Sequence, residues 1–229
     1  MPLRIGFDLD GVLADFASAY HAVETRLFGT APASAPDEPG DEEERQSSPR
    51  AGVSTLSGGR SRIREAIWRE IAATDDFWTT LRPTDPAALR RIHDLMLRHR
   101  WEVFFITQRP ATQGDTVQRQ TQRWLVAQGF DLPSVLVIAG SRGAAAGALR
   151  LDYLVDDSAT NCLDVLSDSS ARPILIVGAP DSPTARRARS LGIGVAGSIR
   201  DAIDLLEQMS AAGQKPGFVE RLAAAVGWQ

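Results

Sequence analysis

Five short, mainly apolar runs alternate along this chain with stretches of helical periodicity, and this alternation constrains the fold more than any other feature. Short continuous apolar runs are typical of parallel strands that are covered on both faces. Alternating strands and helices predict an α/β fold, a Rossmann-like parallel sheet with helices on both faces. The expected strands are residues 3–8, 102–107, 135–139, 153–156 and 174–177.

The alternation stops after the first strand, which predicts an inserted segment. Helical periodicity over residues 16–28 and 63–80 indicates a small helical cap over the carboxyl ends of the strands. Residues 30–62 are rich in Ala, Ser, Pro, Gly and Glu, so we expect a flexible, solvated loop, with docking through its acidic run as the alternative. The expected domains are a core of residues 1–15 and 86–229 and a cap of residues 16–85.

Two carboxylates close the first expected strand. Asp8 and Asp10 are separated by one residue, and Gly11 follows directly. Side chains two positions apart on a strand point the same way, so both carboxylates face one small volume. Two carboxylates at such a short distance repel each other, and a divalent cation between them removes the cost of that repulsion. The pattern predicts a metal site at the carboxyl end of the strand, where open α/β sheets bind ligands.

Polar and charged residues also follow the later strands. Thr107 ends the second expected strand, Arg142 follows the third, and the pair Asp156-Asp157 ends the fourth. Because parallel strands bring their carboxyl ends to one edge of the sheet, these residues can meet although they are far apart in the sequence. The pattern therefore favours one composite site that contains acids, a hydroxyl and a cation.

These residues resemble the motifs of the haloacid dehalogenase-like (HAD) hydrolases. The segment Asp8-Leu9-Asp10-Gly11 is similar to the first motif, the strand ending in Thr107 to the second, and Asp156-Asp157 to the fourth. A helical cap inserted between the first and second motifs is a recurrent arrangement in that family. Residues 76–83 and the length of the cap further resemble the 5'-nucleotidase (deoxyribonucleotidase) branch.

The resemblance implies a two-step hydrolysis of a phosphate ester. Asp8 would attack phosphorus to form an aspartyl phosphate, and Asp10 would protonate the leaving oxygen and then activate water. Thr107 would hold phosphate oxygens, and Arg142 would neutralise charge in the transition state. The implied cofactor is Mg2+, which prefers oxygen ligands. The implied metal ligands are Asp8, Asp10 through its carbonyl, Asp156 and Asp157.

The cation after the third strand departs from the family pattern, in which a lysine is usual. Only Lys215 among the 25 basic residues is a lysine, so a compositional bias explains an arginine at position 142. Arginine keeps the charge and can bind phosphate with two donors, but its fork is larger and has fixed geometry. The alternatives are that Arg142 is a surface residue opening a helix and that Arg109 supplies the cation.

Four further residues are candidates for contacts with the substrate. Gln108 and Arg109 follow Thr107 directly, and we expect them to reach the phosphate or the rest of the substrate. Phe77 and Trp78 lie near the end of the expected cap. They either stack on a flat group such as a nucleobase or belong to the core of the cap.

Charge and composition argue against several classes of partner. A net charge of −4 gives no electrostatic basis for binding nucleic acid or an anionic membrane. No apolar run approaches the ~20 residues of a membrane-spanning helix, and the N-terminus lacks the pattern of a leader, so we expect a cytoplasmic protein. Cys162 is the only cysteine, so no internal disulfide can form. The oligomeric state stays open.

One principal hypothesis and one rival follow from these patterns. The principal hypothesis is a Mg2+-dependent phosphomonoesterase that acts on a small phosphate ester, with a nucleoside monophosphate as the leading candidate. The rival is a protein that keeps the fold, turns over little and acts as a binding or regulatory partner. A phosphoaspartate receiver fits poorly because of the inserted cap, and a second acid at Asp10 argues against dehalogenation.

Overall fold

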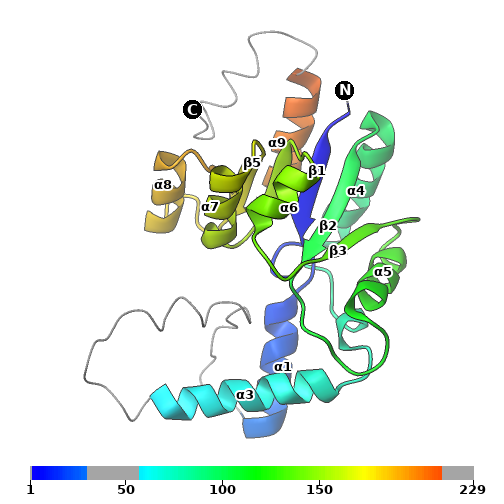
Figure 1. Ribbon diagram of the computed structural model, residues 1–229, viewed down its shortest axis with the longest axis vertical. Coiled ribbons are helices and arrows are strands. Elements are labelled where there is room, and N and C mark those ends of the chain that lie inside the picture. Colours follow the sequence, from blue (N-terminus) through cyan, green and yellow to red (C-terminus); the bar gives the residue numbers. More distant parts are fainter. Residues whose placement is uncertain (1, 30–56, 213–229) are drawn as a thin grey trace.

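The computed structural model describes residues 2–29 and 57–212, and a six-stranded parallel sheet forms its centre. The strand order is β3-β2-β1-β4-β5-β6, so the first strand lies in the middle (Figure 1). The expected α/β fold is confirmed, and the sixth strand, which sequence analysis missed, is only three residues long. The strands are β1 Arg4–Asp8, β2 Glu102–Thr107, β3 Ser134–Val137, β4 Tyr153–Asp156, β5 Arg172–Ile176 and β6 Gly194–Ala196.

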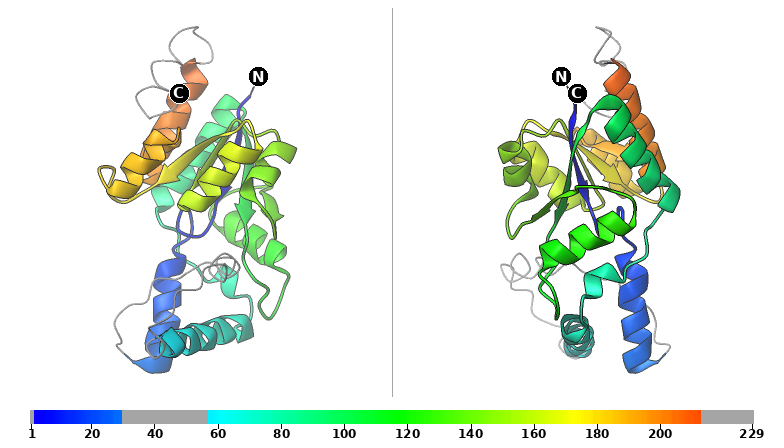
Figure 2. Two further views of the ribbon diagram at one scale, coloured as in Figure 1. Left: turned by 60° about the vertical axis from the view of Figure 1, so that its left-hand side comes forward. Right: turned by 90° about the vertical axis from the view of Figure 1, so that its right-hand side faces the viewer.

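Helices cover both faces of the sheet (Figure 2). The direction of the crossovers reverses between β3 and β4, and right-handed crossovers then place the helices before and after this point on opposite faces. The reversal opens a crevice at the carboxyl ends of β1 and β4, where such sheets bind ligands. One face carries α4 (Pro86–His99), α5 (Val117–Ala127) and α9 (Ile199–Ala212); the other carries α6 (Arg142–Ala148), α7 (Ala159–Asp168) and α8 (Pro183–Ser190).

Side-chain caps fix where these helices begin. Asp85 accepts hydrogen bonds from the amides of Ala87 and Ala88, at 2.9 and 3.1 Å, and Pro86 suits the first turn because its missing amide needs no partner there. Such caps set the start of each helix relative to the strand before it, which places the loop residues in between. Other caps are Asp15 for α1 (Phe16–Phe28), Thr116 for α5, Ser141 for α6, Ser158 for α7, Ser182 for α8 and Ser198 for α9.

The inserted cap consists of α1 and α3 (Ser57–Ala73), which project from the carboxyl edge of the sheet (Figure 1). The two segments that join the cap to the core are paired with each other. The Asp15 amide donates to the Arg82 carbonyl at 2.8 Å, and the Thr84 amide donates to the Leu13 carbonyl at 2.9 Å. The 3-10 helix η1 (Phe77–Thr79) packs on α5, so the last part of the expected cap lies against the core.

Helix α3 begins earlier than the sequence predicts. Residues 57–62 belong to the expected flexible loop of residues 30–62, but they are helical. Extending a helix costs less free energy than starting one. The helix held by the apolar stripe of Ile63, Ile67 and Ile71 therefore extends toward its N-terminus through weak helix formers. The rest of that loop, residues 30–56, lies outside the described residues.

One apolar core joins the sheet to the cap. Phe7 of β1 and Trp124 of α5 belong to the same buried cluster as Tyr20 and Ile67 of the cap. Burial of this kind stabilises by roughly 25 cal/mol per Å² of apolar surface, so the cap is held by packing as well as by its two chain connections. The base of the cap is therefore fixed beside the crevice.

Candidate active site

The loop after β1 turns sharply and brings the first acids beside the fourth strand. Asp8 is buried at the end of β1, and the amides of Leu13 and Ala14 both donate to the Leu9 carbonyl. Gly11 has a φ of +84°, and a Cβ there would lie 1.8 Å from Asp157 Oδ2. The turn therefore requires glycine, and its tightness places Asp8 and its neighbours against the acidic pair after β4.

Arg142 is buried between two of the predicted acids. Its Nη2 donates to Asp8 Oδ1, and its Nε lies 3.4 Å from Asp156 Oδ2. Helix α6 can come this close because its residues are small. A Cβ at Gly143 would lie 2.1 Å from the carbonyl oxygen of Asp164 in α7. The expected meeting of the first and fourth strands is thus present, and Arg142 is not the exposed helix opener of the alternative interpretation.

Asp156 is held by donors from the start of α7. The Ser158 amide donates to it at 2.8 Å, and Asn161 Nδ2 lies 3.2 Å from both of its carboxylate oxygens. Burial raises the pKa of Asp156, and Arg142 and these donors act in the opposite direction. Asn161 was not singled out from the sequence, although its place three residues after the capping Ser158 puts it in the first turn, facing the strand end.

Thr107 and Gln108 lie where β2 passes into the following loop. Thr107 ends β2 and is buried, and the Arg109 amide approaches its hydroxyl at 3.4 Å. Gln108 is half-buried and donates to the Gly140 carbonyl at 3.0 Å. The contact ties the loop after β2 to the loop that leads into α6, so the Gln108 side chain links two edges of the site.

Arg109 has a different place from the one expected. Its Nε and Nη2 each lie 2.8 Å from one carboxylate oxygen of Asp10, and its Nη1 donates to Thr121 Oγ1 at 3.1 Å. Its guanidinium carbon lies 4.8 Å from the centre of the Trp78 ring. The expected substrate contact is corrected: the guanidinium is buried against Asp10 and the core. Thr121, at core-facing spacing on α5, is the sequence signal for a buried polar partner.

The expected stacking surface of Phe77 and Trp78 is also corrected. The two residues are 4% and 1% exposed, so neither ring presents a face to a substrate in this structure. Their rings meet edge to face at 5.1 Å, and Trp78 Nε1 donates to the Pro110 carbonyl at 3.0 Å. Phe16 packs 5.7 Å from the Trp78 ring. Both residues belong to the core, one of the two interpretations that the sequence left open.

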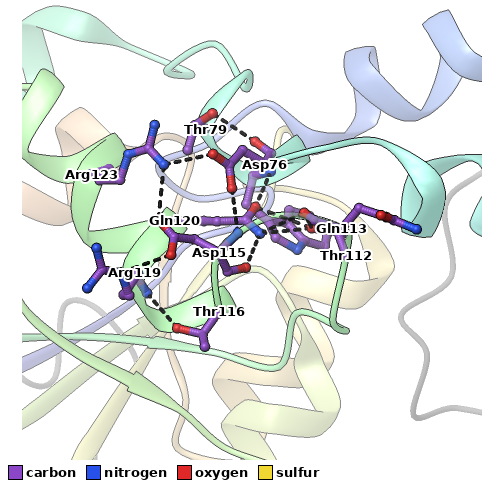
Figure 3. Close-up of polar contacts among 10 residues, drawn as sticks. Asp76, Thr79, Thr112, Gln113, Asp115, Thr116, Arg119, Gln120 and Arg123 are labelled. Carbon is purple, nitrogen blue, oxygen red and sulfur yellow. Dashed lines mark hydrogen bonds and ion pairs between the residues drawn. The ribbon is translucent and has the colours of Figure 1, made fainter.

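A polar network ties the base of the cap to the loop after β2 (Figure 3). Asp76 accepts hydrogen bonds from the Asp115 amide at 2.8 Å and from Arg123 Nη1 at 2.7 Å, and these contacts lower the pKa of Asp76. Gln120, fully buried on α5, accepts from the Trp78 amide at 3.1 Å and donates to the Asp115 carbonyl at 2.6 Å. The loop that follows Thr107 and Arg109 is therefore fastened to η1.

The acidic residues suit Mg2+ in the chemistry of their donors. Asp8, Asp156 and Asp157 offer carboxylate oxygens, and Asp10 offers a backbone carbonyl, which are the ligands that Mg2+ prefers. Two buried carboxyl groups contact the guanidinium of Arg142, so a bound cation would offset the negative charge of the second carboxylate. In the part of the chain that the structure describes, no three acidic, histidine or cysteine side chains form a metal cluster.

Comparison with known proteins establishes the fold. No family model and no curated protein matches the sequence. A haloacid dehalogenase-like hydrolase from Streptococcus pneumoniae is 11% identical, with a TM-score of 0.53 over 90% of this chain and 98% of that one. A phosphonoacetaldehyde hydrolase-like protein from Oleispira antarctica is 16% identical, with a TM-score of 0.53 over 94% of this chain and 96% of that one.

A haloacid dehalogenase-like protein of unknown function from Agrobacterium tumefaciens gives a TM-score of 0.53 at 16% identity, over 92% of this chain and all of that one. At these identities the likeness establishes a shared fold. Two of these three neighbours are described as hydrolases or hydrolase-like and two as haloacid dehalogenase-like, and the chain spans nearly the whole length of each. Among the described helices, none is both long and apolar enough to cross a membrane.

Proposed function

We propose that this protein is a Mg2+-dependent phosphomonoesterase that works through an aspartyl-phosphate intermediate. One observation supports this best: Asp8, Arg142 and Asp156, which come from three separate motifs, form one buried group at the carboxyl edge of the sheet. The fold shared with HAD-superfamily hydrolases agrees with hydrolytic chemistry at this edge. The finer assignment to phosphate esters rests on the motif residues.

The proposed reaction has two displacements at phosphorus. In the first, an Asp8 oxygen forms a bond to phosphorus, the bond to the leaving oxygen breaks, and Asp10 gives its proton to that oxygen. In the second, Asp10 removes a proton from water, the water oxygen bonds to phosphorus, and the bond to Asp8 breaks. Both side chains then return to their starting states, and phosphate is released.

The remaining residues stabilise the negative charge of the phosphate. Thr107 and the amides after it hold phosphate oxygens, and Arg142 places a positive charge where negative charge builds in the transition state. Mg2+ would be held by Asp8, the Asp10 carbonyl and Asp156, with Asp157 beside them. When bound, it supplies the positive charge that allows an anionic nucleophile to approach an anionic phosphate.

The proposed substrate is a small soluble phosphate ester, with a nucleoside monophosphate as the first compound to test. The support is the similarity of residues 76–83 to the 5'-nucleotidase branch, together with a net charge of −4 that disfavours polyanions. Because Phe77 and Trp78 are buried, a nucleobase would be recognised by other residues of the cap.

A second candidate is a binding or regulatory protein with little turnover. Both Asp8 and Asp10 already pair with buried arginines, Arg142 and Arg109, and this observation favours it. The two candidates differ in a hydrolysis screen over nucleotides, sugar phosphates and other small esters with and without Mg2+. No hydrolysis of any ester, together with a tight protein partner in a pull-down, would favour the second candidate.

Substitution of the nucleophile tests the proposed function directly. Asp8→Asn should lower turnover by at least about 1,000-fold, because an amide cannot form the phosphoenzyme. Chelation by EDTA should abolish the wild-type activity, and added Mg2+ should restore it. The exposed Asp131→Asn is the matched control and should keep wild-type turnover. Wild-type rates in Asp8→Asn would refute the proposal.

A further inference from the structure

We propose that Arg109 is a positioning residue that fixes the orientation of the Asp10 carboxylate, and that Trp78 at the base of the cap holds Arg109 in place. The inference rests on the proposed function, because it concerns the step in which Asp10 transfers a proton. It assigns to Arg109 a role through Asp10 in place of a contact with the substrate.

The contact between the two side chains is a two-point fork. Arg109 Nε meets Asp10 Oδ2 and Nη2 meets Oδ1, each at 2.8 Å. Two parallel charge-assisted hydrogen bonds fix the plane of the carboxylate as well as its position. Each carboxylate oxygen has a second acceptor site, so the fork leaves room on Asp10 for a proton and for a leaving oxygen or water.

The two partners differ in access to solvent. The Arg109 side chain is 0% exposed, whereas 16% of the Asp10 side chain stays accessible. A substrate can therefore reach Asp10 but not the guanidinium behind it. A guanidinium buried to this extent requires a paired charge, because unpaired burial costs several kcal/mol. The positions of the Arg109 guanidinium and of the Asp10 carboxylate therefore depend on each other.

Two further contacts hold the guanidinium. Thr121 on α5, which is buried, accepts from Nη1 at 3.1 Å, and the Trp78 ring lies against the guanidinium at 4.8 Å. Trp78 is itself held by the Pro110 carbonyl and by Gln120. The orientation of Asp10 therefore depends on α5 and on η1 at the base of the cap, through one side chain.

A misoriented Asp10 has a specific kinetic signature. Proton donation matters for esters with a poor leaving group, such as an alkyl phosphate, and little for 4-nitrophenyl phosphate, whose leaving group departs as a stable anion. Positioned acid catalysis contributes roughly 100- to 10,000-fold. Loss of orientation should therefore lower kcat for the alkyl ester far more than for the nitrophenyl ester, while a general structural defect lowers both alike.

The experiment measures kcat and KM for both esters in Arg109 variants. Arg109→Ala should lower kcat about 100-fold or more on the alkyl ester and less than about 10-fold on the nitrophenyl ester. Arg109→Lys keeps the charge but not the fork, so it should fall between Arg109→Ala and the wild type. Thr121→Val removes only the hydroxyl acceptor and should change the ratio of the two rates by about 3-fold.

Arg91→Ala is the matched control. It removes an arginine of α4 that pairs with Asp204 and Glu207 of α9 and has no contact with Asp10 or with the base of the cap, so it should leave the ratio of the two esters unchanged. If Arg109→Ala does not fold, Arg109→Lys and Thr121→Val carry the test, with thermal unfolding as the check on each variant.

The outcomes separate this inference from the proposed function. If the wild-type protein hydrolyses the esters and Asp8→Asn does not, but the Arg109 and Thr121 variants lose both esters in equal proportion, the positioning role is wrong and the proposed function stands. If the wild-type protein hydrolyses neither ester, or if Asp8→Asn keeps full activity, the proposed function fails and the inference falls with it.

Discussion

The two arginine–carboxylate groups of the site are built on different charge balances. Arg142 lies between two carboxyl groups, Asp8 and Asp156, and contacts both. Arg109 faces Asp10 alone and meets both of its oxygens at 2.8 Å. The first group joins elements of the core, whereas the second joins the core to the base of the cap through Trp78.

The difference lies in how many carboxyl groups each guanidinium contacts. A one-to-one fork offsets the cost of burying both charges, and its geometry has one stable arrangement. In the other group two carboxyl groups share one guanidinium. Burial raises the pKa of Asp156 there, and Arg142 acts in the opposite direction. We therefore expect the first group to depend less on either one of its carboxylates than the second group depends on Asp10.

The two groups should differ in how much stability each loses when one of its carboxylates is replaced. Asp10→Asn leaves the buried Arg109 without a charged partner, so it should lower the free energy of unfolding by about 3 kcal/mol. Asp8→Asn removes one of two carboxylates while Asp156 still pairs with Arg142, so it should change stability by less than about 1 kcal/mol. Urea unfolding of both variants measures the difference.

Equal losses of unfolding free energy in Asp10→Asn and Asp8→Asn would contradict the expected difference between the two arginine–carboxylate groups. A larger loss in Asp8→Asn would reverse it and make Arg142 the structural partner. Asp131→Asn provides the baseline for an exposed carboxylate.

Gly114 tests how far the Arg109–Asp10 group depends on the base of the cap. It has a φ of +88°, and a Cβ there would lie 2.4 Å from Asp76 Oδ1 and 2.9 Å from the Asp76 amide. Gly114→Ala should therefore destabilise by about 2 kcal/mol and loosen the loop that carries Arg109. Thermal unfolding measures the loss, and the ratio of rates on the two esters should shift toward that of Arg109→Lys.

Gly129→Ala is the matched control for backbone strain. Gly129 has a φ of +102°, but a Cβ there would have no neighbour within 4 Å. Gly129→Ala should lower the free energy of unfolding by about 1 kcal/mol, the cost of backbone strain alone. It should leave the ratio of the rates on the two esters unchanged. Equal effects of the two alanine variants would show that the contact of Gly114 with Asp76 contributes nothing.

The strand ends were predictable from the sequence because the physics that places them is local. Apolar runs mark the strands, and a parallel sheet brings their carboxyl ends to one edge, so the order of the residues alone assigns Asp8, Thr107 and Asp156 to one site. The place of Arg142 followed from the same reasoning. The roles of these residues stay predictions until the variants are measured.

The pairing of the two arginines was beyond this reasoning. Arg109 and Asp10 are 99 positions apart, and their contact depends on the path of two loops that no periodicity describes. The burial of Phe77 and Trp78 is likewise set by tertiary packing. The sequence of an aromatic pair near a helix end is the same whether the pair packs inward or faces a ligand. Strand β6 has three residues, too few for an apolar run to stand out.

An ion pair at the surface gives the reference for both buried groups and the smallest expected effect. Asp85 caps α4 and accepts from Arg200 Nε, and this contact lowers the pKa of Asp85 from 3.8 to about 2. The Arg200 side chain is 63% exposed, so solvent screens the pair and its contribution to stability should be small. Asp85→Asn keeps a good cap and removes only the charge, so it isolates the pair.

The sign of the pH dependence follows from the lowered pKa. The ion pair stabilises the folded state fully above the unfolded pKa of about 3.9, and this contribution is lost as the pH falls toward about 2. The difference in unfolding free energy between the wild type and Asp85→Asn should therefore be constant from pH 7 to about 5 and shrink below that. A difference that grows on acidification would show that another group, and not the Asp85 carboxylate, carries the interaction with Arg200.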